Sequence, residues 1–268
     1  MLCDMSHTPA PPPAAPRPVA LVTGPTAGIG LAFAQQLAAS GHDLVLVSRT
    51  RDRLETLATE LHQRYGVEAD VIVADLGNRA DLAAVEARLA DTSRPVDLLV
   101  NNAGFGLKQK FLDNSVEDEQ YLLDVLVTAV LRLTHAALGP MVQRGAGSIV
   151  NVSSVAGYLP RGTYSAAKAY VTSLSEWADL TYRDQGVRVM ALLPGFTKTE
   201  FHARMDVSRE SAPSWMWLDV DRLVAEALRD LRRGRTISVP SRRYKVLSTA
   251  AKYTPSWLQA RFQGLGRR

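Results

Sequence analysis

Cysteine is almost absent from this sequence. Among 268 residues the only cysteine is Cys3, so no disulfide can form within the chain. Disulfide frameworks belong to oxidising compartments, and their absence favours a reducing, cytoplasmic setting. Because Cys3 lies close to the chain start, in a proline-rich stretch, it is not expected to be a catalytic thiol.

Targeting signals and long apolar runs are also missing. Residues 1–18 are rich in proline and alanine and lack the basic start and apolar run of a secretory signal, so they are expected to be a disordered tail. The most apolar later stretch, residues 122–138, is interrupted by Asp124, Arg132 and His135. A membrane-spanning helix, which needs about 20 apolar residues, is therefore not expected.

Charge is unevenly distributed. The net charge is +4, but residues 242–268 hold seven of the 31 Lys and Arg residues and no Asp or Glu, leaving 24 basic against 27 acidic residues elsewhere. Residues 241–268 are expected to form a basic amphipathic segment. It could pack on the body with its charges in water, or contact a membrane, an acidic carrier protein or coenzyme A phosphates. Nothing else in the sequence supports nucleic-acid binding.

The rest of the chain alternates between two kinds of segment. Hydrophobic residues make up 46% and charged residues 22%, as in a folded globular protein, and the length suits one large domain, expected at residues 19–240. Short apolar runs predict strands at 19–23, 44–48, 69–74, 97–101, 148–153, 188–193 and 236–239, and helices lie between them at 31–40, 52–65, 79–90, 116–143, from about 163 to 185 and 219–233. This order predicts an α/β fold, a Rossmann-type doubly wound parallel sheet of about seven strands with helices on both faces.

A glycine turn links the first strand to the first helix. It reads Gly24-Pro25-Thr26-Ala27-Gly28-Ile29-Gly30. Gly24 allows the tight turn, Gly28 lets backbone N–H groups approach a pyrophosphate, and Gly30 lets the helix pack close to the strand. In this strand–turn–helix context the pattern predicts dinucleotide binding.

The residues after the second strand bear on the choice of dinucleotide. An acidic residue about 20 positions past the glycines would hold a ribose 2′-hydroxyl, but here the position is Ser48-Arg49. An arginine would pair with a 2′-phosphate, so the sequence favours NADP(H) over NAD(H). Arg51 and Arg53 fit better as the solvated start of the next helix.

Polar or small residues also follow the next two strands. Asp75-Leu76 comes after one and Asn101-Asn102-Ala103-Gly104 after the other, at the ends that form the ligand edge of a parallel sheet. Asp75 could accept from an adenine amino group, and Ala103-Gly104 leave room for a flat ring. Turn formation explains both stretches equally well.

A tyrosine and a lysine lie four residues apart in the predicted helix after the fifth strand. At this spacing Tyr164 and Lys168 share one helix face. A nearby cation favours a phenolate, so the pKa of Tyr164 is expected to lie below its usual value of about 10, which suits a proton donor and acceptor.

In this order the motifs resemble the short-chain dehydrogenase/reductase family, in its NADP-preferring form, over residues 19–240. The resemblance implies that Tyr164 exchanges the proton with the substrate oxygen, that Lys168 lowers its pKa and binds the nicotinamide ribose, and that Ser154 hydrogen-bonds the carbonyl. It implies no metal site, and it places Thr197 and the backbone after Pro194-Gly195 at the nicotinamide carboxamide. The expected cofactor-binding residues are Gly24, Thr26, Gly28, Ile29, Gly30, Ser48, Arg49, Asp75, Leu76, Asn101, Asn102, Ala103, Gly104, Tyr164, Lys168, Pro194, Gly195 and Thr197.

Two departures from the family pattern stand out. Ser154 and Tyr164 are ten residues apart, closer than usual, and Pro160 and Gly162 make such a short loop feasible. Leu126 occupies the place of an asparagine that helps to hold a proton-relay water, and leucine cannot hydrogen-bond. Turnover is expected to be slowed rather than abolished, and Leu126→Asn is expected to raise it.

The resulting functional hypothesis is an NADP(H)-dependent oxidoreductase that acts on a carbonyl or secondary alcohol. A substrate lid is expected at residues 198–218, and an apolar ketone, aldehyde or oxoacyl substrate is inferred from the apolar residues in and beside it, Phe196, Phe201, Met205, Trp215, Met216 and Trp217. The alternative is a catalytically weak NADP-binding sensor or scaffold. Relatives of this kind suggest a homodimer or homotetramer assembled through two long helices.

Overall fold

A computed structural model describes residues 16–197 and 213–253. Several sequence predictions fall outside these ranges. They concern nearly all of the proline-rich tail with Cys3, most of the substrate lid with Phe201 and Met205, and the last part of the basic segment.

The core of the molecule is a seven-stranded sheet in the order β3-β2-β1-β4-β5-β6-β7. Every neighbouring pair is parallel. The strands are β1 Val19–Thr23, β2 Asp43–Ser48, β3 Ala69–Val73, β4 Leu98–Asn101, β5 Gly147–Val152, β6 Val187–Leu192 and β7 Ile237–Ser238. The predicted Rossmann-type parallel sheet is therefore confirmed.

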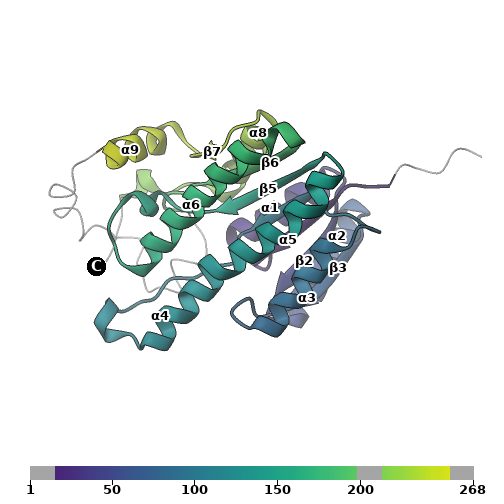
Figure 1. Ribbon diagram of the computed structural model, residues 1–268, viewed down its shortest axis with the longest axis horizontal. Helices are drawn as coiled ribbons and strands as arrows, with labels where there is room; N and C mark the ends of the chain where they lie inside the picture. The colour runs from purple at the N-terminus through teal and green to yellow at the C-terminus, as the bar shows by residue number, and fades with distance from the viewer. Residues whose placement is uncertain (1–15, 198–212, 254–268) are drawn as a thin grey trace, which may run out of the picture.

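The helices cover both faces of this sheet (Figure 1). They are α1 Gly28–Ala39, α2 Arg51–Tyr65, α3 Arg79–Ala90, α4 Val116–Leu123, α5 Ala129–Gln143, α6 Thr163–Tyr182, α8 Val220–Arg232 and α9 Arg242–Tyr253, with the short 3₁₀ turns η1 Phe111–Asp113, η3 Val155–Tyr158, η4 Arg183–Gln185 and η6 Ser214–Met216. Most boundaries lie within a residue or two of the predicted ones. Helix α1 differs more: it begins at Gly28 because the last glycines of the turn already form its first turn.

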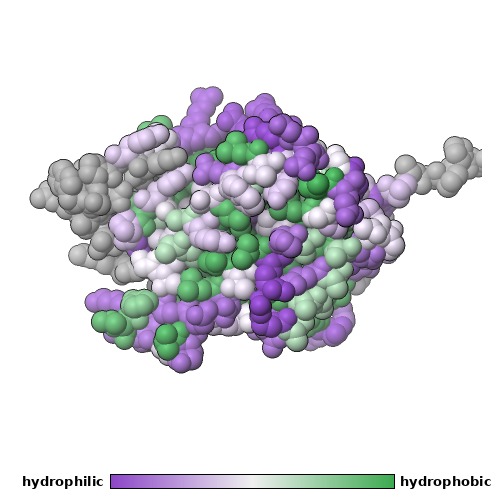
Figure 2. Space-filling view, in the orientation of Figure 1, coloured by the Kyte–Doolittle hydropathy of each residue, from purple (hydrophilic) through white to green (hydrophobic). Residues whose placement is uncertain are grey.

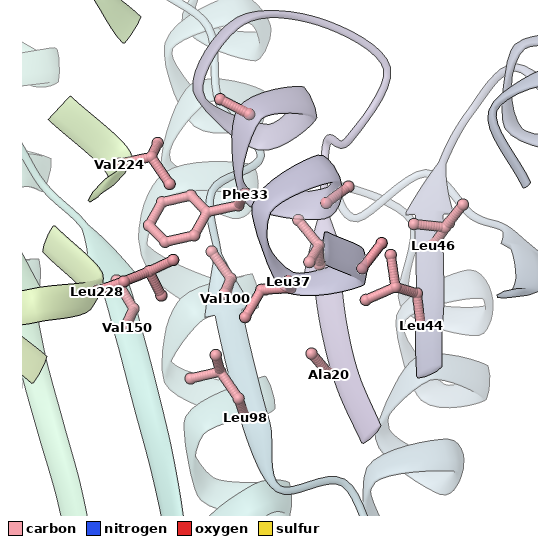
Figure 3. Packing of buried hydrophobic residues seen from close by; sticks show 14 of the residues in the cluster. Ala20, Phe33, Leu37, Leu44, Leu46, Leu98, Val100, Val150, Val224 and Leu228 are labelled. Atoms are coloured by element: carbon pink, nitrogen blue, oxygen red, sulfur yellow. The ribbon is translucent and has the colours of Figure 1, made fainter. Parts of the chain in front are cut away.

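Each face of the sheet has its own apolar layer, because the central strands are buried on both sides. All five residues of β1 are buried, which explains why its sequence shows no polar alternation. On one face α1, α2 and α8 pack together, and Figure 3 shows Phe33 of α1 between Val224 of α8 and Val100 of β4. On the other face α3, α5 and α6 cover residues such as Leu21 and Ile149.

The helix predicted over residues 116–143 is not regular throughout. A π-helical turn, η2 Asp124–Thr128, separates α4 from α5. The whole stretch is long and apolar enough to cross a membrane by length and composition alone. In this fold it is a core helix, because α5 buries Ala129, Leu133 and Ala137 against the sheet and Arg132 pairs with Glu86 of α3.

The strand order reverses between β1 and β4, the third and fourth strands across the sheet. At such a switch point the connections leave in opposite directions and open a crevice at the carboxyl ends of the strands. Gly24 follows β1 and Asn102 follows β4, so both turns border this crevice.

Candidate active site

The glycine turn after β1 fits closely against the turn after β4. Gly24 and Gly28 have φ angles of 65° and 57°, in the left-handed region that favours glycine. A Cβ atom at Gly30 would lie 2.1 Å from the carbonyl oxygen of Gly24, and one at Gly24 would lie 3.1 Å from Cα of Ala103. Gly30 is therefore required by packing within the protein, and Gly24 by its positive φ together with its close contact to Ala103.

Thr23, which was not among the predicted site residues, fastens the two turns together. Its hydroxyl accepts from the backbone N–H groups of Asn102, at 2.9 Å, and Ala103, at 3.0 Å. The amide of Asn102 donates to the carbonyl oxygens of Thr23 and Gly24. A threonine directly ahead of the first glycine was the only sequence signal for this role.

The start of α1 suits an anionic group. Its N-cap residue, Ala27, makes no side-chain hydrogen bond to the helix, and the first turn holds no acidic residue. The first N–H groups of a helix need acceptors, and the helix dipole favours negative charge there. Together with the glycine cradle, this fits the pyrophosphate of a dinucleotide, which Gly24, Thr26, Gly28, Ile29 and Gly30 would surround.

Ser154 and Tyr164 meet beside this crevice. Ser154 follows β5 and caps η3, accepting from the N–H of Ala156 at 3.1 Å. Tyr164 lies in the first turn of α6, and a hydrogen bond joins the two side chains. The short loop between them is closed by η3 and by Gly162, which has a φ of 83°. The close spacing in sequence is thus compatible with contact.

Lys168 lies one turn after Tyr164 and is 5% exposed. Its Nζ donates to the carbonyl oxygen of Val152 at 2.8 Å and lies 5.6 Å from the centre of the Tyr164 ring. Burial lowers the pKa of Lys168 to about 8. The ammonium group is therefore held at the end of β5, beside the ring of the tyrosine.

The pKa of Tyr164 differs from the sequence-based expectation. Burial raises it to about 12, and the hydrogen bond with Ser154 lowers it only in part. Desolvation is the larger of these two causes, and burial also disfavours the charged form of Lys168. The phenol is consequently protonated at neutral pH, which is the form that donates a proton.

Arg49 and Asp75 are linked by a residue that was not predicted, Tyr121 of α4. Its hydroxyl donates to the two carboxylate oxygens of Asp75, at 2.8 and 2.9 Å, and accepts from Nη1 of Arg49 at 3.3 Å. The ring lies against Gly77, where a Cβ atom would be 2.2 Å from Cε2 of Tyr121. Ser48 accepts from the N–H of Thr50. No local pattern connects residue 121 to the strand ends, so sequence reasoning missed it.

The turn after β6 borders the same crevice. The N–H of Val155, next to Ser154, donates to the carbonyl oxygen of Pro194 at 3.1 Å. Thr197 is buried and donates to the carbonyl oxygen of Gly195 at 3.0 Å. The structure therefore places the Pro194-Gly195 turn beside Ser154.

The predicted apolar wall is described in part. Phe196 and Met216 pack against a buried cluster that includes Leu193 and Tyr244. The rings of Phe196 and Trp217 lie 5.6 Å apart, while Trp215 is 51% exposed. Phe196 and Met216 therefore contribute to the core, whereas Trp215 is exposed to solvent.

Leu126 lies in the π-helical turn and is completely buried. It packs in an apolar cluster with Leu122 and Ala167, against which Phe105 and Tyr164 also rest. A Cβ atom at Gly104 would lie 2.8 Å from Cδ2 of Leu126 and 3.9 Å from Nζ of Lys168. The side chains of Leu126 and Lys168 thus both lie close to Gly104. A polar group at position 126 would therefore lie near the ammonium group.

Leu126→Asn is expected to have two opposing effects. An amide near Lys168 could hold a relay water, which would raise kcat of the folded enzyme by up to about 10²-fold. Replacing a buried leucine by an amide would lower the free energy of unfolding by about 2–4 kcal/mol. Steady-state kinetics and urea unfolding measure the two effects separately.

Leu122→Asn is the matched control, because Leu122 is buried in the same cluster one helical turn earlier. It should be destabilised similarly without any gain in rate. Equal or lower kcat in Leu126→Asn than in the natural enzyme would count against a missing relay group.

Within residues 16–197 and 213–253 no group of three or more His, Cys, Asp or Glu side chains could hold a metal ion.

Comparison with known proteins adds independent information. A profile described as short chain dehydrogenase matches residues 18–210. The chain is 34% identical over 203 residues to a very-long-chain 3-oxoacyl-CoA reductase of Anas platyrhynchos, covering 73% of this chain and 63% of that relative. It is also 34% identical over 218 residues to sulfoacetaldehyde reductase 2 of Chromohalobacter salexigens, covering 80% of this chain and 86% of that one.

Two solved structures are similar over most of their length. One is a short-chain dehydrogenase from Sphingobium yanoikuyae in complex with NADPH, with 38% identity, a TM-score of 0.81 and coverage of 87% of this chain and 93% of that one. The other is a bulky-bulky ketone specific alcohol dehydrogenase from Comamonas testosteroni, with 35% identity, a TM-score of 0.76 and coverage of 87% and 91%.

Proposed function

The chain belongs to the short-chain dehydrogenase/reductase family of nicotinamide-dependent oxidoreductases, and on this premise we propose that it transfers hydride between NADP(H) and the carbonyl or secondary alcohol of an apolar substrate. The observation that carries the proposal is the convergence of Ser154, Tyr164 and Lys168 beside the turn after β4, against which the glycine turn packs. A proton donor, a polarising hydroxyl and a buried cation thereby face the crevice that would hold the cofactor.

The side chains have distinct tasks in carbonyl reduction. The nicotinamide cofactor, when bound, supplies the hydride. Ser154 donates a hydrogen bond to the carbonyl oxygen, and Tyr164 gives its proton to that oxygen as negative charge develops. The raised pKa of Tyr164 keeps the phenol protonated until then, and the charge of Lys168 stabilises the phenolate that remains. In the reverse direction, Tyr164 takes the proton of the alcohol.

The preference for NADP(H) rests on the end of β2. Arg49 is exposed there, no carboxylate occupies the following turn, and Tyr121 holds the guanidinium on the side of Asp75. An arginine so placed can pair with a 2′-phosphate. The structural relative from Sphingobium yanoikuyae was solved with NADPH, which supports the same choice.

Arg49→Ala is expected to weaken NADPH binding by about 10- to 100-fold, because a charge-assisted hydrogen bond contributes about 1.5–3 kcal/mol. The dissociation constant for NADH should change by less than about threefold, because NADH lacks the phosphate. Fluorescence titration with both nucleotides measures the ratio of the dissociation constants for NADPH and NADH. Arg51→Ala is the control, because Arg51 is exposed and pairs with Glu55. Equal losses for NADPH and NADH would contradict the assignment of Arg49.

The substrate class rests on apolar side chains and on relatives. Phe196 and Met216 pack against the cluster that includes Leu193, next to the Pro194-Gly195 turn, and Trp217 packs against Phe196. Similar proteins are described as a 3-oxoacyl-CoA reductase and as a bulky-bulky ketone specific alcohol dehydrogenase. These features support a bulky apolar ketone, aldehyde or oxoacyl group.

A second candidate is a catalytically weak NADP-binding sensor or scaffold. It is favoured by Leu126 at the position where a relay asparagine is usual. A panel of apolar ketones, aldehydes and oxoacyl thioesters, assayed through NADPH absorbance alongside binding titrations, separates the two. Turnover supports the reductase, whereas tight binding without turnover of any compound supports the sensor. Failure to bind NADPH would reject both.

The assembly and cellular setting belong to the same proposal. Figure 2 shows apolar patches on the face that contains α5 and α6, and the exposed large apolar residues of these helices are Leu131, Tyr170, Trp177 and Leu180. Such a face suits burial in a homodimer or homotetramer, and light scattering would detect the subunit number. A cytoplasmic location, and contact of the basic segment with a membrane or acyl carrier, are proposed from the sequence alone.

A further inference from the structure

The hydroxyl of Tyr244, in the first turn of α9, lies between two distant parts of the chain. It accepts from the N–H of Phe196 at 2.9 Å and donates to the carbonyl oxygen of Met216 at 2.8 Å. The N–H of Leu218 also donates to the carbonyl oxygen of Phe196 at 2.8 Å, and Thr197 pairs with Leu218 in an isolated parallel bridge. Tyr244 therefore ties residues 196–197, which follow β6, to residues 216–218, which precede α8.

The ring of Tyr244 is matched to the turn beneath it. A Cβ atom at Gly195 would lie 2.0 Å from Cζ of Tyr244, so only glycine leaves room for the ring. Tyr244 is 3% exposed and shares a buried cluster with Leu193, against which Val155 of η3 also packs. One side chain of α9 thus braces the Pro194-Gly195 turn and packs in the same cluster as the loop that follows Ser154.

The entry to α9 is itself fixed from α8. Ser241 has a φ of 78°, an uncommon conformation for a residue with a side chain, and its N–H donates to Glu226 at 3.1 Å. Nζ of Lys245 lies 2.9 Å from the same carboxylate. Arg243 donates to the carbonyl oxygen of Trp215 at 3.1 Å. These contacts fix the start of α9, so that the hydroxyl of Tyr244 stays between the N–H of Phe196 and the carbonyl oxygen of Met216.

We propose that Tyr244 is a positioning residue of the active site, and that α9 belongs to the catalytic unit. The hydroxyl fixes the backbone of Phe196 and hence the turn of Gly195 and Thr197, which borders the reaction site. The inference rests on the proposed function, in which this turn lies at the nicotinamide end of the cofactor. A loosened turn would place the reacting atoms less accurately, and small misplacements reduce rates strongly.

The test is Tyr244→Phe, which keeps the ring and removes only the hydroxyl. We expect kcat for carbonyl reduction to fall about 10-fold, with KM and the dissociation constant of NADPH nearly unchanged because the glycine turn is untouched. The melting temperature should fall by only about 2–4 °C, because two hydrogen bonds are lost while the ring stays in place. Hydrogen–deuterium exchange at the Phe196 amide should become at least about 10-fold faster, because its acceptor is lost. Tyr253→Phe is the control, because Tyr253 is 76% exposed on the same helix.

Unchanged kcat in Tyr244→Phe would overturn the proposal, as would unchanged exchange at Phe196. A general loss of stability, with kcat intact in the folded enzyme, would also overturn it. If the natural enzyme reduces no carbonyl compound, the proposed function fails on its own. Exchange at Phe196 then decides the positioning claim, since faster exchange supports it and unchanged exchange rejects it.

Discussion

Replacing Tyr164 with Phe is expected to lower kcat for carbonyl reduction by about 10³-fold. The substitution removes a single oxygen, the proton donor, and leaves the ring that packs against the cluster of Leu122, Leu126 and Ala167. The dissociation constant of NADPH should stay within about twofold, because the glycine turn and Arg49 are unaffected. Stopped-flow measurement of NADPH oxidation with an excess of the substrate found in the panel gives the rate, and fluorescence titration gives the affinity.

The matched control is Tyr170→Phe, on the same helix. Tyr170 is 38% exposed and lies beyond the first turn of α6, which holds Tyr164. The kcat of Tyr170→Phe should therefore equal that of the natural enzyme. Carbonyl consumption that survives in Tyr164→Phe would show that another group supplies the proton. Tight NADPH binding combined with lost turnover, in contrast, would assign the chemistry to this phenol rather than to the nucleotide site.

Asp179→Ala is expected to give the largest loss of stability, about 3–5 kcal/mol in the free energy of unfolding. Asp179 of α6 is completely buried and ties α6 to the adjoining strands. Its carboxylate accepts from Nε of Arg188 at 2.9 Å, from the N–H of Val189 at 3.1 Å and from the hydroxyl of Thr236 at 2.6 Å. Arg183 donates to it as well. Removing the carboxylate leaves these donors without their shared acceptor.

The same residue predicts a pH dependence. Burial would raise the pKa of Asp179, but the hydrogen bonds from Arg188, Thr236, Val189 and Arg183 hold it at about 2, below the usual value of 3.8. A carboxyl group with a lowered pKa in the folded state stabilises the protein above its unfolded pKa, and this contribution is lost as the pH falls. The free energy of unfolding of the natural protein should therefore approach that of Asp179→Ala as the pH falls from about 4 to about 2.

Denaturant unfolding at several pH values measures this difference. Asp184→Ala is the control, because Asp184 is exposed in the turn that follows α6. If Asp179→Ala lowered the free energy of unfolding by less than about 1 kcal/mol at pH 7, the hydrogen bonds around Asp179 would contribute little to stability. A constant difference from pH 7 to pH 2 would contradict the lowered pKa.

The sequence by itself determined which segments form the strands and helices, and that the strands form a parallel sheet covered on both faces. Short apolar runs rich in valine and leucine predicted the buried strands, because residues buried on both faces need no polar alternation. The glycine spacing predicted the turn after β1, because backbone with positive φ and close packing each demand glycine at fixed positions. The family motifs then predicted that Ser154, after β5, acts together with Tyr164 and Lys168 in the first turns of α6.

Only the tertiary structure determined how these groups affect one another. The pKa of Tyr164 depends on how completely its surroundings exclude water, and no sequence spacing reports burial. Tyr121 reaches Asp75 and Tyr244 reaches Phe196 across more than 40 residues of chain, and such contacts arise when helices dock. Periodicity and motif spacing are local properties, whereas desolvation and docking depend on the packing of the whole chain.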